Sequence, residues 1–312
     1  MISNPEGTIA LSSVGHRDHD NVWMYEAATG RAQVIPLRSG AHLVSLHTSG
    51  SSYFAALQEF ENEHQVEVTV RGFDAPAKVI ASAWLGPEGS KLEGDRSVWQ
   101  KVPTLYVASL QFGEWQDFVL LGVSVGTGRM VAQKLEWYDS RYNKEYQSVL
   151  HVLELPGDNS ALISVQRSSR VILHDRETGR ARAAIELAGR GEASQLRLGS
   201  LDGEIWVKDY DTIVVLERGS WRILRSARLQ EGGDGKVARF VGDFALAPDK
   251  KLCLVARPIS GDVIAIDEAT LQIRGRATTG RQPIEVVMLQ GGEIVARDWK
   301  TGELLLGRME DC

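Results

Sequence analysis

The segment from residue 16 to residue 20 carries side chains that could bind a metal ion. It reads His-Arg-Asp-His-Asp. Imidazole nitrogens and carboxylate oxygens are the donors that divalent cations prefer. The spacing matches no standard metal motif, and a polar loop of this kind is ordinarily solvated. The favoured interpretation is therefore a solvated loop, and the metal-site alternative comprises His16, Asp18, His19 and Asp20.

Aromatic side chains are concentrated in the segment 137–147, which reads WYDSRYNKEYQ. Aromatic residues and arginine dominate the energetics of protein interfaces, because they bury a large area with few rotors and keep a polar tip. The alternative is a loop whose rings pack against its own domain. The partner-binding candidates are Trp137, Tyr138, Arg141, Tyr142 and Tyr146, together with Trp115 in another polar loop.

The elements that must position these segments are short β-strands. Alternating runs rich in Val, Ile, Leu and Tyr are separated by turns of Gly, Asp, Asn and Thr, and no window keeps a helical period. Seven hairpin turns are expected near residues 30, 72, 128, 179, 219, 270 and 302. Their spacing is mostly roughly 40 to 55 residues, the period of a four-stranded propeller blade.

This spacing predicts an all-β, single-domain β-propeller over residues 1–312. Seven blades are favoured, and six with a composite closing blade are the alternative. The first unit is expected to lack its innermost strand, and the last has room for about three strands. Within such a fold, polar residues of inner strands would line a central channel, where simple hydration is the favoured interpretation and a small-ligand site is the alternative. These candidates are His42, His151, Arg197, Arg239 and Glu285.

Composition restricts the class of protein. The chain has 35 Lys and Arg against 41 Asp and Glu, a net charge of −6, which argues against a nucleic-acid partner. Early loops are acidic, and later loops carry Arg167, Arg170, Arg257, Arg297 and Lys300. One face could therefore be acidic on some blades and basic on others, but ordinary mixed surface charge is the favoured interpretation. Cys253 lies in an apolar run and is expected to be a buried small hydrophobe. No signal peptide and no membrane-spanning run is visible, which favours a cytoplasmic protein, although a removed leader stays open.

One repeat is clearer than the others. In Asp262–Leu289, Val263 and Ala265 are expected on one strand face, with Ile264 and Ile266 on the other. Together with the residues up to Asp298, this repeat resembles the YVTN-type repeats of bacterial β-propellers. The matching residues are Ile266, Asp267, Thr270, Gly280, Pro283, Val286, Gly292 and Ala296. The match is partial over about three repeats and faint over 40–150, and the WD-repeat signature is missing.

The resemblance implies a fold more than a function, because related propellers serve as lactonase-like enzymes, redox subunits and binding platforms. No P-loop, HExxH, Gly-x-Ser-x-Gly or haem motif is present, and no cofactor is expected. We therefore expect a non-enzymatic interaction platform or complex subunit that binds a protein through one face and the 137–147 insertion. The alternative is a lactonase-like hydrolase or small-ligand binder that uses the channel residues, with or without a metal.

Overall fold

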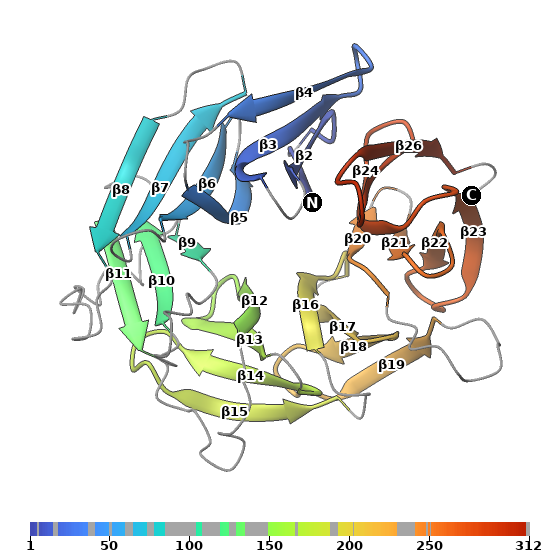
Figure 1. Ribbon diagram of the computed structural model, residues 1–312. Coiled ribbons are helices and arrows are strands. Elements are labelled where there is room, and N and C mark those ends of the chain that lie inside the picture. The colour runs from blue at the N-terminus through green and yellow to red at the C-terminus, as the bar shows by residue number, and fades with distance from the viewer. Residues whose placement is uncertain are drawn as a thin grey trace. The chain divides into compact units, whose positions relative to one another are not determined.

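The described residues of the computed structural model form β-strands arranged in seven antiparallel sheets, five of four strands and two of three (Figure 1). This agrees with the favoured number of seven blades. The structure describes the chain except for residues 5, 15–17, 37–40, 50–51, 60–64, 74–77, 85–103, 108–118, 125–128, 135–148, 166–167, 188–192, 202, 230–240, 248, 250 and 310–312.

The strands group into two units that are described separately. Unit 1 comprises Met1–Ser39, Thr48–Ser51 and Arg197–Cys312, and unit 2 comprises Gly40–His47 and Ser52–Leu196. Strands β5 and β16 each cross a boundary between these ranges. The prediction of a single domain over residues 1–312 stays a prediction.

Four sheets belong mainly to unit 1, and each runs in chain order. Their strands are β1 (Ile2–Ser3), β2 (Ile9–Val14), β3 (Asp18–Glu26) and β4 (Arg31–Pro36); β16 (Ala193–Leu198), β17 (Glu204–Asp209), β18 (Thr212–Glu217) and β19 (Ile223–Arg228); β20 (Phe244–Ala247), β21 (Leu252–Arg257), β22 (Asp262–Asp267) and β23 (Ile273–Thr278); and β24 (Pro283–Met288), β25 (Glu293–Asp298) and β26 (Leu304–Arg308). The first sheet does contain a first strand, β1, so the expectation that it lacks one is wrong. That strand is only two residues long.

Three sheets belong mainly to unit 2. Their strands are β5 (Ala41–Ser49), β6 (Ser52–Glu59), β7 (Gln65–Gly72) and β8 (Lys78–Trp84); β9 (Thr104–Val107), β10 (Val119–Ser124) and β11 (Arg129–Lys134); and β12 (Val149–Glu154), β13 (Ser160–Val165), β14 (Arg170–Asp175) and β15 (Ala181–Glu186). All seven predicted turns fall between strands that pair as antiparallel neighbours.

The hairpin turns share a hydrogen-bond pattern that explains their sequence. In the turn after β22, Asp267 Oδ1 accepts bonds from the backbone N–H groups of Ala269 and Thr270, at 3.0 and 2.8 Å. The N–H of Leu271 then donates to the carbonyl of Asp267. Leu271 has φ 55°, the left-handed conformation that Gly179 and Gly302 supply in the turns after β14 and β25. The aspartates of these turns thus stabilise hairpin geometry.

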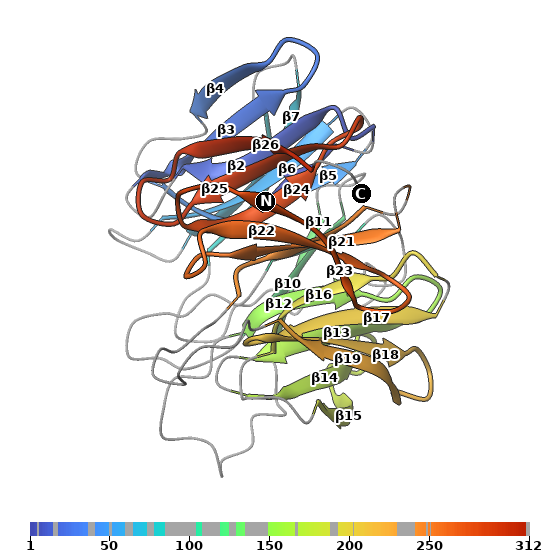
Figure 2. The ribbon, with the colours of Figure 1, turned by 90° about the vertical axis from the view of Figure 1, so that its right-hand side faces the viewer.

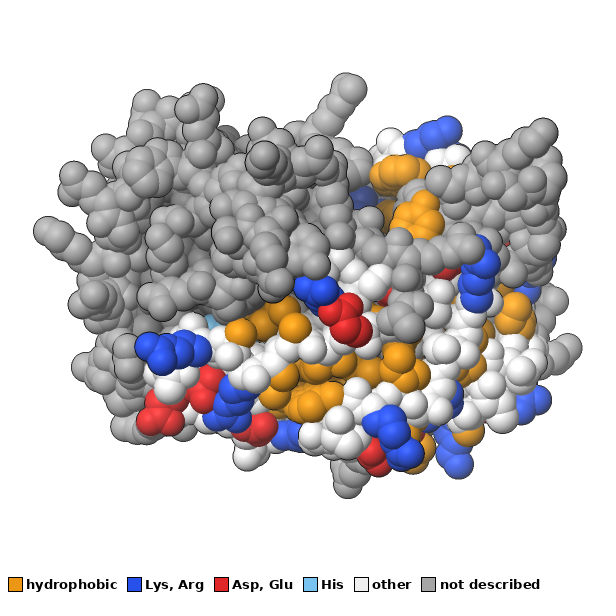
Figure 3. Space-filling model, turned by 90° about the horizontal axis from the view of Figure 1, so that it is seen from below, with side chains coloured by type: hydrophobic (Ala, Val, Ile, Leu, Met, Phe, Trp, Pro, Cys, Tyr) orange, Lys and Arg blue, Asp and Glu red, His pale blue; other side chains and the backbone are white. Residues whose placement is uncertain are grey.

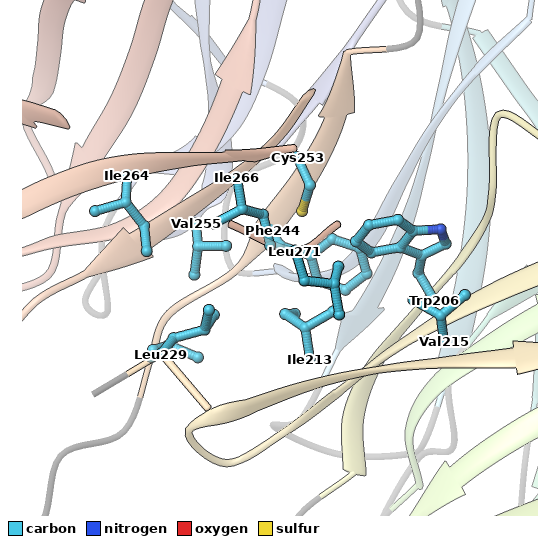
Figure 4. Packing of buried hydrophobic residues seen from close by; sticks show 11 residues of the cluster. Trp206, Ile213, Val215, Leu229, Phe244, Cys253, Val255, Ile264, Ile266 and Leu271 are labelled. Carbon is cyan, nitrogen blue, oxygen red and sulfur yellow. The ribbon is translucent and has the colours of Figure 1, made fainter. Parts of the chain in front are cut away.

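Strand β22 is buried on both faces, as its alternation predicts. Val263 and Ala265 pack toward sheet β24–β26, in a cluster with Val286, Ile294 and Ala296. Ile264 and Ile266 pack toward sheet β16–β19, in a cluster with Trp206, Ile213 and Val215 (Figure 4). A third cluster joins β24–β26 to β1–β4 through Val295, Leu289 and Tyr25. Four sheets of unit 1 therefore stack face to face.

Two further expectations concern single features. Cys253 is completely buried within the cluster of Figure 4, as predicted for a small hydrophobe, and burial raises the pKa of its thiol well above the usual value. None of the described residues forms a helix with the length and hydropathy that crossing a membrane needs.

Candidate functional site

The predicted ligand residues fall on the first strands of their sheets. Arg197 lies in β16, Glu285 in β24, His151 in β12 and His42 in β5, while Arg239 lies outside the described residues. His151 and His42 belong to unit 2, whereas Arg197 and Glu285 belong to unit 1. Two candidates thus lie in each unit, and in unit 1 the charge of Glu285 acts on Arg197.

Arg197 and Glu285 share their surroundings with Asp243 and Arg297. Arg297 Nε lies 3.0 Å from Glu285 Oε2, and the Ser12 hydroxyl donates to the same oxygen at 2.7 Å. The α-amino group of Met1 lies 3.4 Å from Glu285 Oε2 and 3.9 Å from Asp243 Oδ2. We call Arg197, Asp243, Glu285 and Arg297 the unit 1 charge cluster.

Glycine at position 242 lets Asp243 approach Glu285. A Cβ atom at Gly242 would lie only 2.3 Å from the backbone oxygen of Ile284, so no side chain fits there. The N–H of Asp243 donates to that oxygen at 2.6 Å, and the N–H of Gly242 donates to Ala256 at 2.8 Å. The segment before β20 is thereby held against β24, and Asp243 lies near the carboxylate of Glu285.

Strand register places Arg297 beside Glu285. The two residues are direct partners in the antiparallel pair β24–β25, so their side chains share one face. Sequence reasoning placed Arg297 in an exposed loop, and this is wrong: it lies within β25 and its side chain is buried. Asp243 and Ser12 were not singled out, because neither stands in a recognisable motif.

The charges of the cluster shift one another's pKa values. Burial raises the pKa of Glu285, but the Met1 amino group, the Arg297 ion pair and the Ser12 hydrogen bond outweigh burial, so this pKa falls below its usual range. Burial also lowers the pKa of Arg197, and the carboxylates of Asp243 and Glu285 oppose that shift. For Arg297, burial lowers the pKa, but the hydrogen bond and charge of Glu285 together with the carboxylates of Asp243 and Asp298 outweigh burial and raise it. Glu285 and Arg297 are therefore both charged at neutral pH.

Such a group of charges can bind charged small molecules. The side chain of Asp243 is 34% exposed, while that of Glu285 is 18% exposed. A ligand with an anionic group could engage Arg197, and one with a cationic group could engage Asp243. Within the described ranges, no group of three or more His, Cys, Asp or Glu residues has the arrangement of a metal site.

The other candidates are placed differently. The partner-binding set, Trp137, Tyr138, Arg141, Tyr142, Tyr146 and Trp115, lies outside the described residues, as does His16. Asp18, His19 and Asp20 lie within strand β3 and not in the expected loop. Strand β3 begins at Asp18, where its pairing with β2 starts opposite Val14.

Ordinary mixed surface charge is the favoured interpretation of the charged loops, and the alternative of a basic face on the later blades fails at two of its residues. Arg257 is buried in an ion pair with Asp262, with Nε 2.8 Å from Oδ1, and Arg276 of β23 lies 3.2 Å from the same carboxylate. Arg257 and Arg297 therefore stabilise the interior and do not form a basic surface. On the described surface of Figure 3, acidic and basic side chains are interspersed with exposed hydrophobic ones.

Comparison with known proteins identifies the fold. The structure resembles the β-propeller domain of Cps50 (Swd1) from Myceliophteria thermophila, with a TM-score of 0.66 and 13% identity, over 98% of this chain and 94% of that one. It also resembles the WD40 β-propeller domain of Doa1, with a TM-score of 0.66 and 12% identity, over 97% of this chain and 90% of that chain. A chain of a mitotic checkpoint complex gives a TM-score of 0.67 at 8% identity, over 99% of this chain and 86% of its own.

Sequence comparisons do not assign the chain to a protein family. No protein-family model matches the chain, and no curated protein matches it. The structural relatives cover nearly the whole chain at identities that carry information about fold alone. The prediction of an all-β propeller built from antiparallel sheets is confirmed, and the chain has the β-propeller fold of WD40 proteins without their sequence signature.

Proposed function

We propose that this protein is a non-enzymatic interaction platform or complex subunit that binds a partner protein through one face and the 137–147 insertion. The observation that carries the proposal is the whole-chain likeness to propellers, one of which was solved as part of a mitotic checkpoint complex. Propellers present many loops on a rigid scaffold, which suits protein recognition. The aromatic and arginine content of residues 137–147 supplies the side chains that interfaces favour.

Ion pairs between strands of unit 1 support the same proposal. Several of its charges form ion pairs that join strands, such as buried Arg257 with Asp262 and partly buried Arg225 with Glu204. The Arg225–Glu204 contact is bidentate, at 2.7 and 2.8 Å, and the guanidinium also lies 5.5 Å from the Trp206 ring centroid. Paired charges of this kind rigidify a scaffold and leave recognition to its loops.

Co-purification tests the proposal. The double variant Trp137→Ala with Tyr142→Ala is expected to keep the fold and to lose a protein that co-purifies with the tagged native chain. A matched control, Val34→Ala with Leu224→Ala, removes exposed apolar groups elsewhere and should retain that protein. Identical sets of co-purified proteins for the native chain and the Trp137/Tyr142 variant would refute the proposed binding surface.

The unit 1 charge cluster favours a second candidate, a small-ligand binder. The half-buried guanidinium of Arg197 lies in the field of two carboxylates, so it is positioned for a ligand that carries both charges. Calorimetric titration with glutamate and with citrate tests this function. Binding that is lost in Arg197→Ala and kept in Arg228→Ala, whose half-exposed side chain pairs with Asp211, would support the candidate. No heat with either compound would exclude these two ligand classes.

We also infer that the repeats are of the YVTN type. Asp267 and Asp298 bind the backbone of their turns in the same way, and Gly280 at φ 64° precedes the strand that begins at Pro283. Asp267, Gly280 and Pro283 are among the residues that carry the resemblance. Replacing Asp262–Leu289 by a YVTN consensus repeat should leave a folded protein with an unchanged circular dichroism spectrum. Loss of the β-sheet spectrum would contradict this assignment.

A further inference from the structure

We propose that Ser200 and Glu268 form a pH-sensitive latch between two neighbouring sheets of unit 1. The carboxyl group of Glu268, in the turn after β22, takes up a proton in mildly acidic solution and keeps the loop 199–203 closed against that turn. Ionisation of the same group favours the open loop. The latch lies outside the unit 1 charge cluster and needs no partner protein, so it goes beyond the proposed function.

The loop 199–203 connects β16 to β17, and Ser200 ties it to the next sheet. Strands β17–β19 and β20–β23 are neighbours that share an apolar cluster (Figure 2). Within its own sheet, the loop is closed by the N–H of Gly199, which donates to the carbonyl of Glu204 at 2.8 Å. Ser200 Oγ donates to Glu268 Oε1 at 2.8 Å, and among the described residues of the loop it alone bonds to the neighbouring sheet. One contact between two side chains therefore fixes the loop across the sheet boundary.

Glu268 is a buried carboxyl group that lacks a cation of its own. Its side chain is only 5% exposed, and within the described part of the chain its carboxylate accepts the Ser200 bond and makes no ion pair. Burying an ionised carboxylate costs free energy unless a cation compensates it. Burial accordingly raises the pKa of Glu268; the Ser200 bond and the charge of Arg225 oppose the shift, and the carboxylates of Glu204 and Asp267 add to it.

The nearby arginines are engaged by other acceptors. Arg225 holds the carboxylate of Glu204 through two bonds, at 2.7 and 2.8 Å, and Arg274 lies 3.0 Å from Asp267. Arg225 also donates two bonds to the backbone oxygen of Glu268, at 3.0 and 2.7 Å. A backbone oxygen does not titrate, so Arg225 holds the turn in place at every pH. Titration of Glu268 therefore acts on the Ser200 side of the contact.

Two further segments meet the turn, and neither competes for the proton. Strand β21 brings Cys253, whose thiol pKa is raised well above its usual value by burial, with a further contribution from the charge of Glu268. This thiol stays neutral in mildly acidic and neutral solution. Lys251 contributes its backbone oxygen, which accepts the N–H of Glu268 at 3.0 Å. Glu268 is thus the group of this contact that changes charge.

The direction of the pH effect follows from the two states of the carboxyl group. An open loop returns this group to water, where its pKa lies near the usual value of 4.5. The closed state has the higher pKa, so it binds the proton more tightly. Protonation therefore stabilises the closed loop at low pH. This stabilisation is lost as the pH rises through the raised pKa of the closed state.

Trp206 provides a reporter of the loop position. A Cβ atom at Gly199 would lie 3.0 Å from Trp206 Nε1, so the loop backbone lies directly against the indole. Trp206 is completely buried, and its Nε1 has no hydrogen-bond partner among the described residues. In Figure 4 this nitrogen points away from the apolar cluster. Because a buried donor without a partner costs free energy, opening of the loop gains the hydration of this N–H.

A carboxyl titration tests the first step. Full-length protein with isotope-labelled glutamate side chains is followed by NMR, and the Glu268 signal is the one missing from Glu268→Gln. We expect its midpoint to lie above the usual value of 4.5, because burial outweighs the Ser200 bond. A midpoint at or below 4.5 would overturn the proposal.

Solvent access to Trp206 tests the opening. The protein is labelled with fluorotryptophan, Trp206→Phe assigns the signal, and a soluble gadolinium chelate reports exposure. Relaxation of the Trp206 signal should be enhanced at least about twofold more at about pH 8 than at about pH 5. In Glu268→Gln, whose uncharged amide resembles the protonated acid, it should stay low at both. Equal enhancement at both pH values in the native protein, or an unchanged pH dependence in Glu268→Gln, would refute the latch.

A second variant keeps the test independent of how well Glu268→Gln folds. Ser200→Ala removes a bond that lowers the pKa of Glu268, so the carboxyl midpoint should move to higher pH. The matched control is Ser220→Ala, whose hydroxyl bonds Glu217 in an exposed turn, and it should leave the midpoint unchanged. If Ser200→Ala leaves the midpoint unchanged as well, the contact is not the latch. All these measurements use the isolated chain, so their failure leaves the proposed interaction function untouched.

Discussion

Strands β22 and β26 hold the same place in neighbouring sheets, and their surroundings differ. Strand β22 lies between β21 and β23 and is buried along nearly its whole length, whereas β26 pairs with β25 alone within the described part of the chain and exposes its last three residues. Both strands contain consecutive apolar residues, Val263–Ile266 in one and Leu304–Leu306 in the other. The difference shows that the fourth strand, and not the composition of the third, decides how completely the third strand is buried.

The largest expected effect is on the free energy of unfolding, when an apolar side chain is truncated in β22 or in β26. Ile264 is completely buried, so Ile264→Ala should lower the free energy of unfolding by about 2–5 kcal/mol. Leu305, at the corresponding place in β26, is only half-buried, so Leu305→Ala should cost about 1 kcal/mol. Urea denaturation followed by tryptophan fluorescence would compare the two variants. Equal losses would mean that the edge of β26 is covered in solution.

A pH dependence tests burial in another covered third strand. His174 of β14 is completely buried, and burial lowers its pKa to about 4, with opposing effects from Asp175 and Arg176. Unfolding restores a pKa near 6.5, so the unfolded chain takes up the proton first as the pH falls. Stability should therefore decrease between pH 6.5 and about 4, by up to about 3 kcal/mol.

The matched variant is His174→Gln, which removes the titrating group. Denaturation midpoints measured across the same pH range should fall less steeply for this variant than for the native protein. If both proteins show the same slope, then His174 is protonated in the folded state and β14 is less well covered than the structure indicates.

A smaller effect concerns the turn that leads into β26. Asp298 accepts bonds from the N–H groups of Gln282, Lys300 and Thr301, at 2.8, 2.9 and 2.8 Å. Asp298→Ala should lower the free energy of unfolding by about 2 kcal/mol, because several backbone donors lose a charged acceptor. Asp267→Ala, in the exposed turn after β22, should cost less, since Asp267 binds only its own hairpin. Thermal unfolding would rank the two, and the reverse order would contradict this account.

The smallest expected effect is at the open edge itself. Leu306→Lys should change the free energy of unfolding by no more than about 0.5 kcal/mol, because the side chain already faces solvent. Ala265→Lys, at the corresponding position of β22, would bury an unpaired charge and should prevent folding. Expression and circular dichroism of the two variants would show the contrast. A Leu306→Lys protein that fails to fold would mean that the edge is already occupied.

Much of the fold could be predicted from the sequence because its signals are local. Alternation in 263–266 predicted which residues of β22 share each face, and turn residues such as Thr178-Gly179 marked the hairpins. The site was harder to predict. Arg197 and Glu285 were placed on first strands correctly, yet Asp243 was missed, because its position depends on the close approach of Gly242 to Ile284.

The sequence by itself determined the strands, the turns and the repeat period, since each depends on residues within one hairpin. Only the tertiary structure decided that Arg297 is buried beside Glu285 and that β26 lacks the cover that β22 has. Both facts depend on pairing between strands, and the charges of Arg197, Asp243 and Glu285 come together from separate sheets. Contacts between segments so distant in the chain leave no periodic signal in the sequence, and only the packed structure reveals them.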